Sequence, residues 1–225
     1  MFDLISQWSH AGAAILFAAL AVWVGRTARP GRLSAILICA CGMTASWALF
    51  AATGDPQTLI SRLAESARNL LWLGFMFALW RQGAGERKTA TVVILYGVIG
   101  CVVGLQMVVD ALPVTVAGSV RWVDAVFFTS LILRMITAVG ALVLVHNLYT
   151  AATLEARSAI RLPMIALTML WAYDLNLYTT AYLAGTGPTE LFALRGLAIL
   201  LVVPLFALSA NQTPTMTMQI GRAHV

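Results

Sequence analysis

Long apolar runs, each close to twenty residues, recur along the whole chain. A helix of about twenty residues crosses roughly 30 Å of hydrocarbon. The runs lack the apolar–polar alternation that is typical of membrane-spanning strands, which argues against a β-barrel. Only 10% of the residues are charged, whereas a soluble domain carries about a quarter. The sequence therefore predicts an all-α fold, a polytopic bundle embedded in a lipid bilayer.

The apolar runs predict about seven transmembrane helices. In the third run, only residues 70–80 are strongly apolar, and Arg62, Glu65 and Arg68 precede them. That charged half either faces protein or lies in the membrane interface, and we predict one long helix that contains it. The predicted spans are residues 5–24, 33–52, 56–80, 89–109, 125–146, 162–183 and 191–210.

Basic residues gather in alternate loops of the predicted bundle. Segments 25–32, 81–88 and 147–161 contain an excess of arginine over acidic residues. The other loops carry more acids than bases, and their acids are Asp3, Asp55, Asp110, Asp124 and Glu190. Basic loops stay in the cytoplasm, so we predict the N-terminus outside and the C-terminus inside. This distribution also explains the net charge of +5 without a nucleic-acid partner.

Several charged residues fall inside the predicted spans. An ionised side chain at the centre of a bilayer costs about 2.5–3.5 kcal/mol, so each needs a partner or a purpose. Arg134 and Asp174 are equally far from the inner ends of two consecutive, antiparallel spans. We therefore predict that they form an ion pair. Glu65, Arg68 and Arg195 are expected to join them in a polar layer slightly outside the midplane.

The segment WAYDLNLYTT around Asp174 is too polar for a helix that faces lipid. Asp174 and Tyr178 are four residues apart and share one helix face, and Tyr173 and Asn176 occupy the neighbouring face. Two interpretations remain open. The layer is a ligand pocket or a polar hinge for signalling, or it is an internal ion-pair network that sets helix register and binds nothing.

No motif in the chain supplies catalysis. A retinal-binding protein needs a lysine within a helix, but the only lysine, Lys88, falls in a predicted loop. The metalloprotease, nucleophile-elbow, nucleotide-binding and dinucleotide-binding motifs are absent. Cys39, Cys41 and Cys101 lie within apolar runs and lack metal-ligand spacing. We therefore predict no catalytic residue, no metal and no cofactor in this part of the protein.

The last six residues, IGRAHV, match the translation of a common short-read sequencing adapter. We therefore expect that residues 220–225 are an artefact and that the natural sequence continues differently after Gln219. On this interpretation residues 1–210 form a membrane-embedded sensor or anchor domain. Residues 211–219 would begin a cytoplasmic continuation.

Short motifs in about the last quarter of the chain are unusual for a membrane helix. They are EAR at 155–157, YDLNLY at 173–178, RG at 195–196 and PL at 204–205. Together they make segments 155–183 and 194–214 resemble the PrsK family. These are membrane histidine kinases associated with PEP-CTERM/exosortase systems in Gram-negative bacteria.

The resemblance implies a multi-pass sensor in the bacterial inner membrane, followed by a dimeric kinase core. That core would use ATP and Mg²⁺, autophosphorylate on histidine and pass the phosphate to a response regulator linked to exopolysaccharide production. The phospho-acceptor helix and the ATP-binding domain are missing here, as expected for a truncated chain. The alternative is a small transporter or channel that uses the polar layer around Asp174, although the chain shows no inverted repeat.

Overall fold

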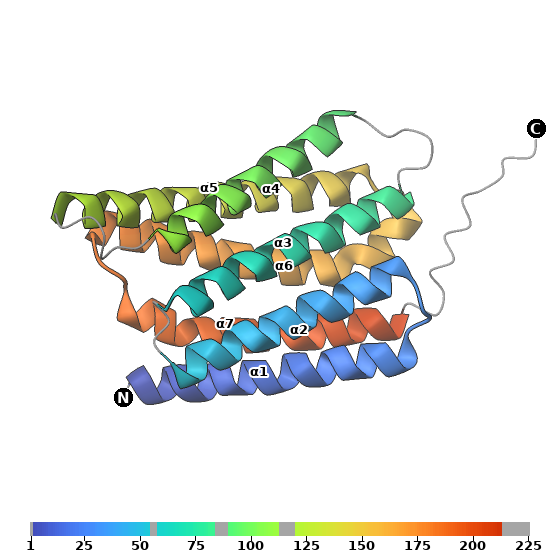
Figure 1. The fold of residues 1–225 in the computed structure, drawn as a ribbon. Helices are drawn as coiled ribbons and strands as arrows, with labels where there is room; N and C mark the ends of the chain where they lie inside the picture. Colours follow the sequence, from blue (N-terminus) through green and yellow to red (C-terminus); the bar gives the residue numbers. More distant parts are fainter. Residues whose placement is uncertain (1, 55–57, 84–89, 113–119, 213–225) are drawn as a thin grey trace, which may run out of the picture.

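The computed structural model describes residues 2–54, 58–83, 90–112 and 120–212, and these form seven α-helices and no strand (Figure 1). An all-helical fold was predicted, and the structure has one. Of the predicted continuation at 211–219, residues 211 and 212 belong to the last helix, and the rest lies outside the described residues, as does the expected artefact at 220–225. The helices are α1 (Phe2–Thr27), α2 (Arg32–Thr53), α3 (Leu59–Gly83), α4 (Ala90–Ala111), α5 (Val120–Ala151), α6 (Leu154–Ala184) and α7 (Thr189–Gln212).

The seven helices form a closed ring. Each helix packs against the next one in the chain, and α7 returns to pack against α1. Figure 1 shows α1, α2 and α7 along one side of the bundle and α4 and α5 along the other. A contact between α3 and α5 adds to the ring. The odd-numbered helices therefore begin at the end of the bundle where the chain starts, and the even-numbered helices end there.

Five helices are long and apolar enough to cross a membrane: α1, α2, α4, α7 and most of α5. Large apolar side chains such as Ile15, Ile94 and Leu201 are exposed on their outer faces. An outer surface of this kind is consistent with a helical membrane bundle, because lipid would cover it. The remaining helices, α3 and α6, contain more charge, and α3 buries Glu65 and Arg68 inside the protein.

The predicted loop at 147–161 is wrong. Helix α5 continues to Ala151 and α6 begins at Leu154. The Arg157 guanidinium provides hydrogen bonds for backbone carbonyl groups at the C-terminal end of α5. It donates to the carbonyl oxygens of Tyr149 at 3.1 Å, Thr150 at 2.6 Å and Ala152 at 3.0 Å. Hydropathy detects only the apolar part of a helix, so it misses a polar extension whose terminal carbonyls are satisfied in this way.

A glycine sets the close packing of α1 against α7. A Cβ atom at Gly196 would lie 2.7 Å from the backbone nitrogen of His10 and would also overlap the Ser9 side chain. The Ser9 hydroxyl donates to the carbonyl oxygen of Ala193 at 3.2 Å, directly beside this contact. Only glycine therefore lets the two backbones approach closely enough to close the ring.

We predict that Gly196→Ala destabilises the bundle by about 1–3 kcal/mol, the usual cost of overpacking. The measurement is the thermal unfolding midpoint of the purified chain in detergent. The control is Gly100→Ala on α4, where a Cβ would meet no described atom within 4 Å. Equal midpoints for the two variants would contradict the close α1–α7 contact.

Candidate functional site

Asp174 of α6 lies between two buried guanidiniums. Its Oδ2 atom accepts a hydrogen bond from Arg68 of α3 at 2.7 Å, and its Oδ1 atom accepts one from Nε of Arg195 of α7 at 2.8 Å. All three side chains are almost completely buried. This carboxylate therefore ties three helices together away from bulk water.

Glu65 of α3 is a second buried carboxylate that joins several helices, and we refer to Asp174 and Glu65 as the two acidic centres. Its carboxylate pairs with Arg134 of α5 and Arg195 of α7, and it accepts a hydrogen bond from the Tyr178 hydroxyl of α6. Arg195 also donates to the Tyr178 oxygen at 2.9 Å. Arg195 therefore contacts both acidic centres, so a movement of α7 would disturb both together.

Asp110 extends these contacts to a fifth helix, α4. It pairs with Arg62 at 2.6 Å and with Arg134 at 3.1 Å. Gln106, one turn earlier on α4, donates to Asp110 at 2.9 Å and to Ser130 of α5 at 2.8 Å. We refer to the connected set as the ion-pair network, and it comprises Arg62, Glu65, Arg68, Asp110, Arg134, Asp174, Tyr178 and Arg195.

The charges of the ion-pair network do not balance. Its ion pairs involve four arginines and three carboxylates, which leaves an excess of one positive charge (4 − 3 = +1). Trp47 of α2 offsets part of this excess, because the guanidiniums of Arg68 and Arg195 lie 4.5 and 4.7 Å from the centre of its ring. Nε and Nη1 of Arg68 have no hydrogen-bond partner among the described residues.

The structure brings together most of the residues predicted for the polar layer. Glu65, Arg68, Arg134, Asp174, Tyr178 and Arg195 all belong to the ion-pair network. Two predicted members lie apart from it. The Tyr173 hydroxyl donates to the carbonyl oxygen of Leu191 at 2.6 Å, and the Asn176 side chain is exposed.

The predicted Arg134–Asp174 ion pair is wrong. Arg134 pairs with Glu65 and Asp110, whereas Asp174 pairs with Arg68 and Arg195. The predicted pair rested only on the equal depth of Arg134 in α5 and Asp174 in α6. Helix α3 supplies both an acid and a base at the same level, so each predicted partner finds an opposite charge on α3 instead.

Sequence reasoning missed Asp110 and did not count Arg62 as a site residue. The sequence predicts Asp110 in an outer loop, but the residue lies within α4 and is buried. The four-residue spacing of Gln106 and Asp110 was an available signal, because it places two polar side chains on one face of an otherwise apolar helix. A lipid-facing helix would not carry such a pair.

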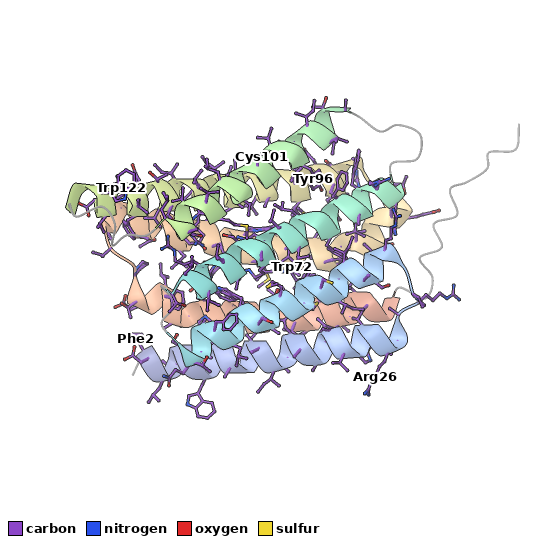
Figure 2. The ribbon with its side chains drawn as sticks, viewed as in Figure 1. Phe2, Arg26, Trp72, Tyr96, Cys101 and Trp122 are labelled. Atoms are coloured by element: carbon purple, nitrogen blue, oxygen red, sulfur yellow. The ribbon has the colours of Figure 1, made fainter. Side chains whose placement is uncertain are left out.

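A cavity of about 750 Å³ lies over the ion-pair network. It opens at the end of the bundle where Figure 2 labels Phe2 and Trp122, opposite the end that carries Arg26. Charged and polar side chains of the ion-pair network line it together with an apolar wall. The polar ones are Arg62, Glu65, Arg134, Tyr178 and Arg195, and the wall includes Val123, Val126, Phe127, Leu131, Leu177 and Phe192.

Aromatic packing closes the bundle beneath the ion-pair network. Trp72, one turn along α3 from Arg68, stacks on Phe206 of α7 with ring centres 4.6 Å apart. The Trp72 indole also donates to the Thr44 hydroxyl at 3.1 Å. Within the described ranges, no group of three or more His, Cys, Asp or Glu side chains could hold a metal ion. The cavity therefore opens at one end of the bundle only, and its inner surface, which we call the floor, is formed by charged side chains of the ion-pair network.

Comparison of the chain with models of protein families, with curated proteins and with solved structures found no match. The resemblance of segments 155–183 and 194–214 to PrsK-type kinases therefore stays a prediction.

We predict that a double-mutant cycle separates the observed pairing from the one expected from depth alone. Arg68→Gln and Asp174→Asn should show a coupling energy of about 0.5–3 kcal/mol, because the two side chains are in contact. Arg134→Gln and Asp174→Asn should couple more weakly. The measurement is the free energy of unfolding in mixed micelles. A larger coupling for the Arg134 pair would contradict the observed network.

Proposed function

We propose that this chain is the membrane-embedded sensory region of a two-component histidine kinase. The observation that carries the proposal is Arg195. This side chain belongs to the last described helix, α7, and it bonds to Glu65, Asp174 and Tyr178 at the floor of an open cavity. A ligand in the cavity would thus act on the helix that leads to any domain that follows.

The proposed mechanism is a shift between two arrangements of the ion-pair network. A ligand shifts such an equilibrium only by binding one arrangement more tightly than the other. Arg195 has acidic partners on both α3 and α6, so a change of partner would displace α7 relative to those helices. Packed and paired helices tend to switch between discrete arrangements rather than deform continuously, which would turn a small displacement into a signal.

We also propose that all seven helices span the bacterial inner membrane, with the N-terminus outside. Helices α3 and α6 have 25 and 31 residues, which is enough length to cross, and the ion-pair network buries the charges near their outer halves. The end opposite the cavity carries exposed arginines, as a cytoplasmic end does. They are Arg26, Arg29, Arg32, Arg81 and Arg161.

The resemblance to PrsK-type kinases adds the partners of the proposed full-length protein. A kinase core after residue 219 would bind ATP and Mg²⁺ and would hold two copies together as a homodimer. It would phosphorylate a response regulator. The sensory region contributes no catalytic residue in this scheme; it sets how often the core adopts its active arrangement.

We expect cysteine labelling to establish the orientation. In a background with Cys39, Cys41 and Cys101 replaced by alanine, Thr189→Cys lies at the cavity end and Thr27→Cys at the opposite end; both positions are exposed. A membrane-impermeant maleimide added to spheroplasts should label the cysteine at 189 and should reach the one at 27 only after permeabilisation. The reverse pattern would contradict the proposed topology.

The intact gene provides the decisive test of the kinase proposal. Genomic sequence beyond codon 219 should encode a histidine-containing dimerisation helix and an ATP-binding domain. In the purified full-length protein, Arg195→Gln should change the basal autophosphorylation rate by about fivefold or more, the lower range of allosteric coupling. Arg26→Gln, at the exposed opposite end, should not. A stop codon shortly after codon 219 would refute the proposal.

A second candidate function is transport of a small ion or solute through the bundle. The favouring observation is that the cavity leads from one end directly to buried charges. Against it, the Trp72 and Phe206 rings stack within the bundle beneath these charges, and each described helix runs without a break. Flux of phosphate or acetate into proteoliposomes, lost in Asp174→Asn, would favour transport over sensing.

A further inference from the structure

We propose that the cavity binds an amphiphilic anion, a molecule with a carboxylate or phosphate head and an apolar chain. This inference rests on the proposed function, because it takes the cavity as the place where a sensed ligand binds. It adds the chemical class of that ligand, which follows from the floor and the wall of the cavity.

The floor of the cavity favours a negative charge. Three arginines, Arg62, Arg134 and Arg195, line the cavity, against two described acids, Glu65 of the ion-pair network and Asp3 of α1. The network as a whole has one arginine more than it has carboxylates. An unbalanced charge held away from water is costly, so an anion that neutralises it gains strongly.

Arg62 is the most accessible guanidinium of the floor. Its side chain is 19% exposed, whereas those of Arg134 and Arg195 are 8% and 2% exposed. Nε and Nη2 of Arg62 both reach the same Asp110 oxygen, which leaves Nη1 for another partner. Asp110 also pairs with Arg134, so it does not fully balance Arg62. The head of the ligand would bind here by a charge-assisted hydrogen bond.

The wall of the cavity excludes an inorganic anion as the best-fitting ligand. Val126, Phe127 and Leu131 of α5 and Phe192 of α7 line the cavity together with the charged side chains. The volume of about 750 Å³ is typical of sites for organic molecules, which occupy roughly 300–1,000 Å³. Free phosphate would leave this apolar surface wet, whereas an alkyl chain would cover it. A cationic amphiphile would be repelled by the excess positive charge of the arginines.

The test is a binding titration of the chain in nanodiscs of zwitterionic phosphatidylcholine, with empty nanodiscs as the blank. The probe is decanoate, compared with decyltrimethylammonium and with inorganic phosphate. We expect saturable binding of decanoate only. Arg62→Gln should weaken decanoate binding by about tenfold or more, because the head group loses its charge-assisted hydrogen bond. The ion-pair network should survive this change, because Asp110 keeps Arg134 and Gln106 as partners. Arg26→Gln, the matched control, should bind decanoate as the wild type does.

A second variant tests the cavity without touching the ion-pair network. Gly187 lines the mouth, and a Cβ atom there would meet no described atom within 4 Å. Gly187→Trp should therefore fold normally and weaken decanoate binding by obstructing the mouth. Gel filtration of both variants checks that each is folded before its affinity is compared with that of the wild type.

Nanodiscs that contain phosphatidylglycerol identify the source of the ligand. If an anionic lipid supplies the head group, the apparent affinity for decanoate should fall as the fraction of phosphatidylglycerol rises. A constant affinity would assign the site to a free amphiphile. Both results support an amphiphilic anion, because the same head and chain are recognised in each.

Preferred binding of decyltrimethylammonium, or unchanged decanoate binding in both Arg62→Gln and Gly187→Trp, would overturn the inference. Neither outcome would contradict the sensory proposal. That proposal is tested by whether the gene encodes a kinase core after codon 219 and by the autophosphorylation rate of the Arg195→Gln variant. Conversely, saturable decanoate binding in a protein with no kinase core would leave the ligand class standing and remove the proposed output.

Discussion

The pairing of Glu65 and Asp174 with arginines from three helices is the constraint on which the rest of the structure depends. Removing such charges from water is costly, and pairing each acid with arginines offsets much of that cost. Arg195 pairs with both acids, while Arg68 and Arg134 each complete one of them. Helices α3, α5, α6 and α7 are therefore restricted to registers in which each buried acid keeps an arginine partner.

The packing of the other helices follows from this arrangement. Helix α2 contributes Trp47, whose ring lies against Arg68 and Arg195, so the aromatic side chain continues the polar centre into the apolar core. Helix α1 closes the ring only because Gly196 lets it approach α7 at the level of His10. The cavity lies directly beside this centre, since Arg62, Glu65, Arg134, Tyr178 and Arg195 all line it.

Hydropathy along the chain was enough to predict the all-helical fold and the approximate position of each described helix. It failed between α5 and α6, where Arg157 satisfies the carbonyl groups of Tyr149, Thr150 and Ala152 and the helices extend to residues 151 and 154. Hydropathy measures transfer into lipid and contains no information about hydrogen bonds at a helix end. A single long α3 is predicted because its strongly apolar residues 70–80 are too few to cross a bilayer alone, and the structure has one continuous helix there.

The sequence by itself determined that charged residues from several helices would lie at one level, because depth depends only on distance from the end of a helix. It did not determine their partners. The pairing of Asp174 with Arg68 rather than Arg134, and the inclusion of Asp110, depend on how each helix is rotated about its axis and on which helices are neighbours in the ring. Those quantities arise from packing among all seven helices, so only the tertiary structure decided them.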